Sequence, residues 1–312
     1  MLLGVWISPS PGQDATKKTR DTTPRDEVVT TADRRKIYLT YFPSTAGKNA
    51  PVAILLHNRG GNRLVWGSPP DYKSGFAKQL QDSGFAVAAV DLRRHGESKV
   101  TSKTKSKSSR GSANLTKRDY IGMAADLEAV KKFLLSEHQE GNLNIRKTAI
   151  VAAEMTAPIA LSYAAFDWAK VPYEDAPIVA ACTPRGQDIR SVILLSPEAN
   201  VPGITSAKSV ASLRIPQKRF SVLICVGAND RKGKADAKKL YDQFASNVAN
   251  KKRIYLRNSY KTNARGTNLI SGAGRQASVE ESMFSFLKRH KEELKFVEWA
   301  DRRPRYNRDD DE

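Results

Sequence analysis

Residues 147–165 read KTAIVAAEMTAPIALSYAA, and this stretch decides the fold that we expect for the chain. Its first part, Ala149 to Ala152, has the length and apolar character of a buried strand. A tight turn follows and leads into an apolar helix that opens near Thr156. The turn contains Glu154 but no Ser, Cys or Asp. The sequence therefore places a carboxylate at a strand–turn–helix junction.

Segments of strand and helix character alternate on both sides of this junction. Apolar runs of strand length occur at residues 51–56, 86–91, 191–195, 221–226 and 253–256. Segments with apolar residues at helical spacing lie at residues 73–83, 117–138, 232–247 and 279–296. This alternation favours an α/β fold with a mainly parallel central sheet and helices on both faces.

The expected domain begins with two alternating runs, residues 27–31 and 36–41, which predict an antiparallel N-terminal hairpin. No stretch between residues 27 and 297 resembles a domain boundary, so we expect a single domain there. Residues 1–26 are interpreted as a flexible N-terminal segment. Residues 298–312 are interpreted as a polar C-terminal tail.

The net charge of +19 is the unusual global property of the chain. It predicts attraction to anionic surfaces such as nucleic acid, anionic lipid or acidic glycan. Residues 99–118 concentrate the basic side chains and contain no acidic or aromatic residue. This stretch is either a solvated, mobile loop or a contact for an anionic polymer or lipid. In the second case the anion-binding residues are Lys99, Lys103, Lys105, Lys107 and Arg110.

The N-terminus leaves the localisation open. Residues 1–8 (MLLGVWIS) are apolar, and the small residues Ser10 and Gly12 follow them. A complete signal peptide also has a basic start and a longer apolar core. The segment is therefore either the disordered start of a cytoplasmic protein or the remnant of an export signal. No apolar run approaches the roughly 18 residues that a membrane-spanning helix needs.

Three loops that follow predicted strands carry short motifs that resemble those of a known fold family. Residues 55–63 read LLHNRGGNR, residues 91–98 read DLRRHGES, and residues 226–230 read VGAND. In this order they resemble the oxyanion loop, the Asp-x-Arg-Gly-His-Gly-x-Ser loop and the acid-bearing strand end of the α/β-hydrolase fold family. The second motif departs from the family pattern at Arg94. The resemblance implies an α/β-hydrolase fold.

That resemblance also implies a Ser-His-Asp site, of which this chain keeps only the acid. The nucleophile position aligns with Glu154, the histidine position with Arg265 and the acid with Asp230. The oxyanion-loop positions align with Asn58, Arg59 and Met155. Residues 196–219 are the one candidate for a lid, and because they are few we expect little or no lid.

Two properties of the predicted turn follow from these alignments. The glycines that flank the family's nucleophile are replaced by Ala152 and Thr156, which predicts a relaxed turn. A buried Glu154 is unfavourable unless it is paired, and the planar guanidinium of Arg265 can bind a carboxylate bidentately. With Asp230 taking the remaining donors, we expect a charge cluster of Glu154, Arg265 and Asp230 where a triad would lie.

The four histidines provide no general base in the loop after the last strand. His57 and His95 lie in matched loops, where we expect structural roles with the rings held by the backbone. His138 and His290 lie on predicted helices, on faces that we expect to be solvated.

Other side chains and motifs predict structural roles. Cys182 and Cys225 lie in apolar surroundings and are expected to be buried and unpaired. Trp66 is expected in the core or as a loop anchor. There is no Walker loop, no Gly-x-Gly-x-x-Gly opening a helix and no metal-ligand spacing, so the sequence predicts no cofactor and no metal.

Three classes of function remain open from the sequence. The first is a catalytically degenerate hydrolase homologue, with a small molecule or a protein as its partner in a binding or structural role. The second is an active ester or acyl hydrolase with an unrecognised constellation of residues. The third is an anionic-polymer-binding protein that uses its basic surface.

Overall fold

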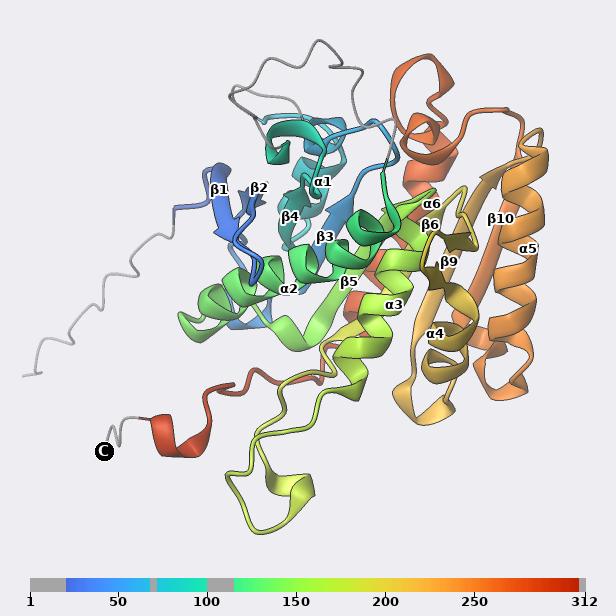
Figure 1. Cartoon of the computed structure of the whole chain (residues 1–312). Coiled ribbons are helices and arrows are strands. Elements are labelled where there is room, and N and C mark those ends of the chain that lie inside the picture. The colour runs from blue at the N-terminus through green and yellow to red at the C-terminus, as the bar shows by residue number, and fades with distance from the viewer. Residues whose placement is uncertain (1–20, 68–71, 100–114, 309–312) are drawn as a thin grey trace, which may run out of the picture.

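The computed structural model describes residues 21–67, 72–99 and 115–308 (Figure 1). Its centre is an eight-stranded sheet in the order β1-β2-β4-β3-β5-β6-β9-β10. The strands of this sheet are β1 (Arg25–Thr30), β2 (Lys36–Phe42), β3 (Val52–Leu56), β4 (Ala86–Val90), β5 (Thr148–Ala153), β6 (Ile189–Leu195), β9 (Ser221–Gly227) and β10 (Ile254–Tyr260).

The sheet is parallel from β4 to β10. β2 runs antiparallel to β4, and β1 pairs with β2 as a hairpin in which Val28 lies opposite Tyr38. The expected hairpin and mainly parallel sheet are thus confirmed. β5 occupies the interior of the sheet, and all its residues are buried because both faces are covered.

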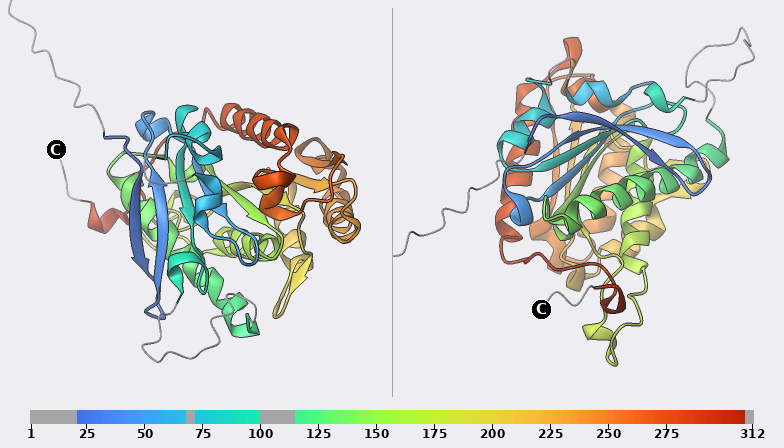
Figure 2. Two further views of the ribbon diagram at one scale, coloured as in Figure 1. Left: turned by 90° about the horizontal axis from the view of Figure 1, so that it is seen from above. Right: turned by 90° about the vertical axis from the view of Figure 1, so that its left-hand side faces the viewer.

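Helices cover both faces of the sheet, as Figure 2 shows from two further directions. One core contains apolar side chains of α2, α3, α4 and α5, and the other contains those of α1 and α6. The helices are α1 (Phe76–Asp82), α2 (Lys117–Gln139), α3 (Thr156–Ala169), α4 (Ser206–Leu213), α5 (Arg231–Ala245) and α6 (Ala277–Glu293). Trp66 is fully buried in the second core, which confirms its expected core position.

The segment between β6 and β9 is more regular than its sequence suggested. It contains the two-stranded ribbon of β7 (Asn200–Val201) and β8 (Ile204–Thr205), followed by α4. α4 packs against α3 and α5, and buries Val210 and Leu213. The short helix escaped sequence analysis because only one turn of its face is apolar.

The predicted polar tail is docked onto the domain as far as Arg308. The Trp299 indole N–H donates to the His138 carbonyl oxygen, and the two rings lie 4.9 Å apart. Arg302 is 5% exposed and binds both carboxylate oxygens of Asp188 at 2.7 and 3.1 Å. These contacts tie the segment after α6 to α2 and to the start of β6.

The expectation that His138 and His290 are solvated is wrong. His138 is fully buried, and its ring contacts the carbonyl oxygens of Leu143 and Ala300. His290 is 4% exposed and stacks on Phe286. Both residues continue the apolar stripe of their own helix, because His138 follows Leu134 by four residues in α2 and His290 follows Phe286 by four in α6. Helical spacing therefore places both rings on the buried face.

The two cysteines differ in their exposure. Cys225 is buried in β9, as expected, whereas Cys182 is partly exposed in the connector between α3 and β6. Its apolar sequence neighbours Ile178 and Val179 are themselves exposed, so local composition misled the prediction. Within the described residues, no helix combines the length and the apolar character that crossing a membrane requires.

Candidate functional site

Glu154 lies at the carboxyl end of β5, at the sharp turn into α3. Its φ angle is +49°, in the left-handed region that side-chain-bearing residues rarely adopt. The predicted relaxed turn is therefore wrong. The strain falls on Glu154 itself, and the flanking Ala152 and Thr156 do not need glycine's freedom. The Thr156 hydroxyl instead braces the turn by bonding to the N–H and the C=O of Ala153 at 2.8 and 2.9 Å.

The structure brings Glu154, Arg265 and Asp230 together at this end of the sheet. Arg265 comes from the loop after β10, and its Nε lies 3.0 Å from Asp230 Oδ2 and 3.7 Å from Glu154 Oε1. Asp230 is the N-cap of α5, where it also accepts the Gly233 N–H at 2.9 Å. Asp230 is thus the closer partner, and the bidentate grip on Glu154 that we expected does not form.

Arg265 retains unused hydrogen-bonding capacity. Its Nη2 is buried and has no hydrogen-bond partner among the described residues. The side chain as a whole is 33% exposed, whereas that of Asp230 is only 3% exposed. The cluster therefore lies at the boundary between the core and solvent.

The surroundings of Glu154 favour its protonated form. Burial raises the pKa of the Glu154 carboxyl; Arg265 opposes the rise, and Glu198 and Asp230 add to it. A side-chain hydrogen bond with Asn58 favours the ionised form. The Glu154 side chain is still 15% exposed, so solvent reaches its carboxylate.

Gly266 is a site residue that sequence analysis missed. It has a φ of +55°, and a Cβ added there would lie 2.9 Å from Glu154 Cγ and 3.2 Å from Asn58 Cβ. The neighbouring Thr267 hydroxyl donates to Asn58 Oδ1 at 2.9 Å. Glycine at this position lets the loop after β10 approach the turn closely. Its adjacency to Arg265 was the available sequence signal.

Glu198 is a second missed residue, from the segment after β6. Its backbone N–H donates to the Glu154 carbonyl oxygen at 3.1 Å, and its carboxylate lies 3.7 Å from Arg59 Nη2. Arg59 also donates to the Tyr120 hydroxyl of α2. Two neighbouring carboxylates, Glu198 and Glu154, therefore lie between two cations: Arg59 is near Glu198 and Arg265 is near Glu154.

The three oxyanion-loop positions have different surroundings. The Asn58 side chain bonds to Glu154 on the turn and to Thr267 in the loop after β10, as described above. Arg59 is directed toward Glu198 and Tyr120. Met155 is fully buried and its side chain belongs to the core beneath α2 and α3. Asn58 therefore contacts the Glu154 side chain, and Met155 follows Glu154 in the sequence. The Arg59 side chain contacts Glu198 instead.

His57 and His95 have the structural roles expected of them. The His57 ring contacts the Asn58 carbonyl oxygen at 2.8 Å, and its Nε2 accepts the Leu92 N–H at 3.2 Å. Burial, with a smaller contribution from His95, lowers the pKa of His57 to about 3. His95 bonds to the Arg93 carbonyl oxygen at 2.9 Å. Both rings are held by the backbone beneath the loops.

Most of the basic stretch at residues 99–118 lies outside the residues that the structure describes. Its first residue, Lys99, is described and exposed. Lys103, Lys105, Lys107 and Arg110 lie outside the described residues, as does the apolar N-terminus. In the described part of the chain, no group of three or more His, Cys, Asp or Glu side chains could hold a metal ion.

Comparison with solved structures identifies the fold. The Pyrococcus furiosus esterase Pf2001 superposes with a TM-score of 0.55 at 15% sequence identity, covering 85% of this chain and 90% of the esterase. The dienelactone hydrolase of Anabaena variabilis gives a TM-score of 0.54 at 15% identity, covering 86% and 98%. Porphyromonas gingivalis dipeptidyl peptidase 4 gives a TM-score of 0.51 at 14% sequence identity, covering 86% of this chain and 36% of the peptidase. No protein-family model and no curated protein sequence matches the chain.

These similarities establish that the chain has the α/β-hydrolase fold, with the sheet order and helical layers described above. At such low sequence identity they establish the fold alone, and activity must be argued from the residues of the site.

Proposed function

We propose that this protein is a catalytically degenerate member of the α/β-hydrolase fold and serves a binding or structural role. The observation that carries the proposal is the ion pair between Arg265 and Asp230, with Glu154 on the nearby turn. Charged side chains that hold one another occupy the positions where the fold's hydrolases need a nucleophile and a base.

The chemistry of these side chains supports the proposal. A guanidinium stays protonated in proteins, so Arg265 cannot accept a proton from a nucleophile or a water molecule. His57 and His95 are buried and bonded to the backbone, and burial lowers the pKa of each. Among the described residues, no histidine contacts Glu154, Asp230 or Arg265. The proton relay of a Ser-His-Asp hydrolase therefore has no equivalent in this cluster.

The cluster has a structural use in this proposal. It joins the turn after β5, the start of α5 and the loop after β10 through Glu154, Asp230 and Arg265. Arg265 provides the positive charge for carboxylates that burial would otherwise destabilise. The residual exposure of Glu154 and Arg265 leaves the cluster accessible to a polar ligand.

An active ester or acyl hydrolase is the second candidate. It is favoured by the strained left-handed conformation of Glu154 and by the raised pKa of its carboxyl, on a side chain that is still 15% exposed. Glu154 would act as general base: it takes a proton from water, the water oxygen bonds to the acyl carbon, and the alcohol leaves with that proton. The solved esterase and dienelactone hydrolase of the same fold support the same substrate class.

A hydrolysis screen with short-chain p-nitrophenyl esters separates the two candidates. Under the first proposal, the wild-type protein and Glu154→Gln hydrolyse these esters at the same slow rate. Turnover that saturates with substrate and is lost in Glu154→Gln would reject it and support the hydrolase. Glu198→Gln is the matched control because it removes the neighbouring carboxylate and leaves the turn residue in place.

A further inference from the structure

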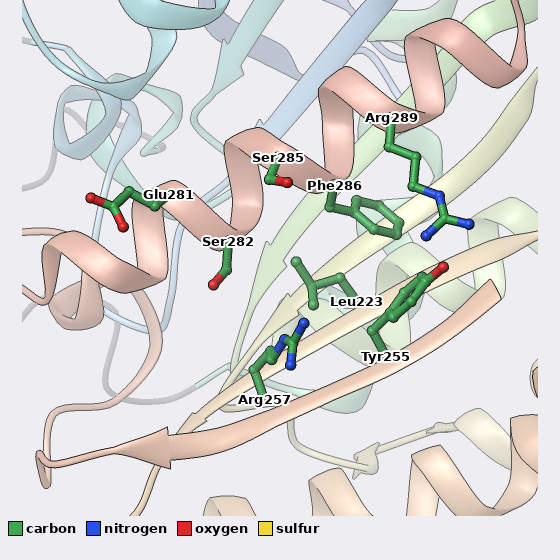
Figure 3. Close-up of a pocket in the computed structure, with 8 residues that line it drawn as sticks. All are labelled: Leu223, Tyr255, Arg257, Glu281, Ser282, Ser285, Phe286 and Arg289. Carbon is green, nitrogen blue, oxygen red and sulfur yellow. The ribbon is translucent and has the colours of Figure 1, made fainter. Parts of the chain in front are cut away.

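A pocket lies beside α6 on the sheet face that α1 and α6 cover (Figure 3). Its volume is about 300 Å³, and it is lined by residues of β9, β10 and α6. None of the residues that line it belongs to the cluster of Glu154, Arg265 and Asp230.

The floor of this pocket is apolar and aromatic. Leu223 of β9 is 2% exposed and Phe286 of α6 is 8% exposed, while Tyr255 of β10 is partly buried beside them. The rings of Tyr255 and Phe286 meet edge to face, with centroids 6.0 Å apart and planes at 76°. A flat apolar molecule can cover these side chains and exclude water from them.

Two arginines give the pocket a positive rim. Arg257 is exposed on β10, and its side chain forms no ion pair or hydrogen bond with any described residue. Arg289 lies 5.5 Å over the ring of Tyr255 and pairs with Glu293 at 3.1 Å. Glu293 is itself shared with Arg253 at 2.6 Å, so the rim keeps an excess of positive charge. Figure 3 shows the two guanidinium groups on opposite sides of the floor, with Arg257 toward Leu223 and Arg289 toward Phe286 and Tyr255.

We propose that this pocket binds a small organic anion with a planar apolar body. The body rests on Tyr255, Phe286 and Leu223. Arg257 binds the carboxylate or phosphate ester at one side of this floor, and Arg289 adds positive charge at the other. Planar guanidinium groups form strong, charge-assisted hydrogen bonds with both kinds of anion. The volume suits a ligand of about one or two rings, at the lower end for small-molecule sites.

The acidic residue of the pocket provides an internal check on this assignment. Glu281 is exposed at the end of the pocket near Ser282, away from Arg289 in Figure 3. Its charge opposes an anion, whereas that of Arg257 attracts one. Neutralising the two side chains should therefore shift affinity in opposite directions, which a general effect on folding would not produce.

Binding is tested by titrating the full-length protein with phenyl phosphate and benzoate, observed by ligand NMR. Benzamide tests the need for charge, and inorganic phosphate tests the need for a ring. We expect saturable binding of at least one aromatic anion with a millimolar dissociation constant. Benzamide and inorganic phosphate should bind at least about tenfold more weakly. The tighter of the two anions identifies the preferred acid group.

Three variants locate the binding. Arg257→Gln should weaken the binding of the preferred anion by about tenfold, because a charge-assisted hydrogen bond is lost. Glu281→Gln should tighten it. Arg118→Gln, which removes an exposed charge from α2 near the opposite edge of the sheet, should leave it unchanged.

Several results would overturn the proposal. These are the absence of saturable binding, equal binding of benzamide, and equal weakening by Arg257→Gln and Arg118→Gln. If Arg257→Gln alters the circular dichroism spectrum, Arg289→Gln takes its place in the same comparison. Unchanged affinity in that variant would equally reject the site.

Discussion

Arg265 Nε lies 3.0 Å from Asp230 Oδ2 but 3.7 Å from Glu154 Oε1, so the helix cap of α5 is its main partner. The turn carboxylate is held less tightly than the sequence alignment suggested. This asymmetry separates two roles within one cluster: Asp230 and Arg265 connect α5 to the loop after β10, while Glu154 keeps a partly exposed carboxylate.

Arg265→Ala should lower the free energy of unfolding by about 1–2 kcal/mol. The change leaves Asp230, which is 3% exposed, without its cation, although the Gly233 N–H still binds it. The value lies at the lower end for buried pairs because Arg265 is one-third exposed. Urea denaturation measures it. Arg265→Lys keeps the charge and should lose less, whereas an unchanged midpoint for Arg265→Ala would contradict a stabilising cluster.

The pH dependence of stability should report the raised pKa of Glu154. Between the unfolded value, about 4.5, and the raised folded value, the folded state binds a proton that the unfolded state releases. Stability conferred by this group is therefore present at acidic pH and falls as the pH rises through the folded pKa. Glu154→Gln should remove that fall.

The measurement is the difference in unfolding free energy between Glu154→Gln and the wild type, followed from acidic to neutral pH. It should grow in favour of the variant as the pH rises. Because all other groups are common to both proteins, their titration cancels. A difference that does not vary with pH would show that Glu154 has an ordinary pKa.

His290→Phe should stabilise the protein. Both ring nitrogens of His290 are buried without a hydrogen-bond partner among the described residues, and the ring stacks on Phe286 with planes 3° apart. A phenyl ring keeps the stacking and removes the unsatisfied groups, for a gain of about 1 kcal/mol at neutral pH.

The gain from His290→Phe should increase in acid. Burial lowers the pKa of His290 to about 4, although Glu293 opposes the shift. The unfolded chain therefore binds a proton below its value of 6.5 that the folded protein excludes, and wild-type stability falls from 6.5 down to about 4. Thermal denaturation at several pH values measures the effect. A pH-independent gain would mean that His290 titrates alike in both states.

Arg302→Met should lower the free energy of unfolding by about 3 kcal/mol. Arg302 is buried and binds Asp188 through two nitrogens, and Asp188 would keep only Lys131 at 2.6 Å. Chemical denaturation measures the loss. Arg302→Lys keeps the charge but not the planar guanidinium, and it should lower the free energy of unfolding by less. Full stability of Arg302→Met would mean that the pair of Arg302 and Asp188 does not stabilise the docking of this segment.

Sequence pattern predicted the elements of this fold better than their contacts. The run of apolar residues at 149–152 and the helix after Thr156 placed Glu154 at the turn, and three loop motifs indicated the fold. Each of these signals is local, because hydrophobic period and loop composition are set by neighbours in the chain.

The missed features have different physical causes. The φ of Glu154 is imposed by the reversal between β5 and α3, so small flanking residues did not relax it. Glu198 reaches the turn from the segment after β6, and no periodicity in a single sequence reveals that contact. His290 is a different case, because it lies at helical spacing from Met283 and Phe286 on the buried face of α6.

Gly266→Ala should lower the free energy of unfolding by about 2–4 kcal/mol. Two effects add: a φ of +55° strains any side-chain-bearing residue by about 1–2 kcal/mol, and the new Cβ meets Glu154 Cγ at 2.9 Å. Gly272→Ala is the matched control, because its φ is +60° and a Cβ there meets nothing within 4 Å. It should show the backbone strain alone.

The steric part of the stability loss in Gly266→Ala can be isolated with a second substitution at the turn. In Glu154→Ala the Cγ that obstructs position 266 is absent, so adding Gly266→Ala should lower the free energy of unfolding by less than it does in the wild type. The loss should stay above that of Gly272→Ala, because the new Cβ still meets Asn58 Cβ at 3.2 Å. The difference between the losses measured with and without Glu154 is then the contact energy of the loop against the turn. Equal losses in both backgrounds would show that the loop after β10 does not press on Glu154, and that the cluster is looser than its distances indicate.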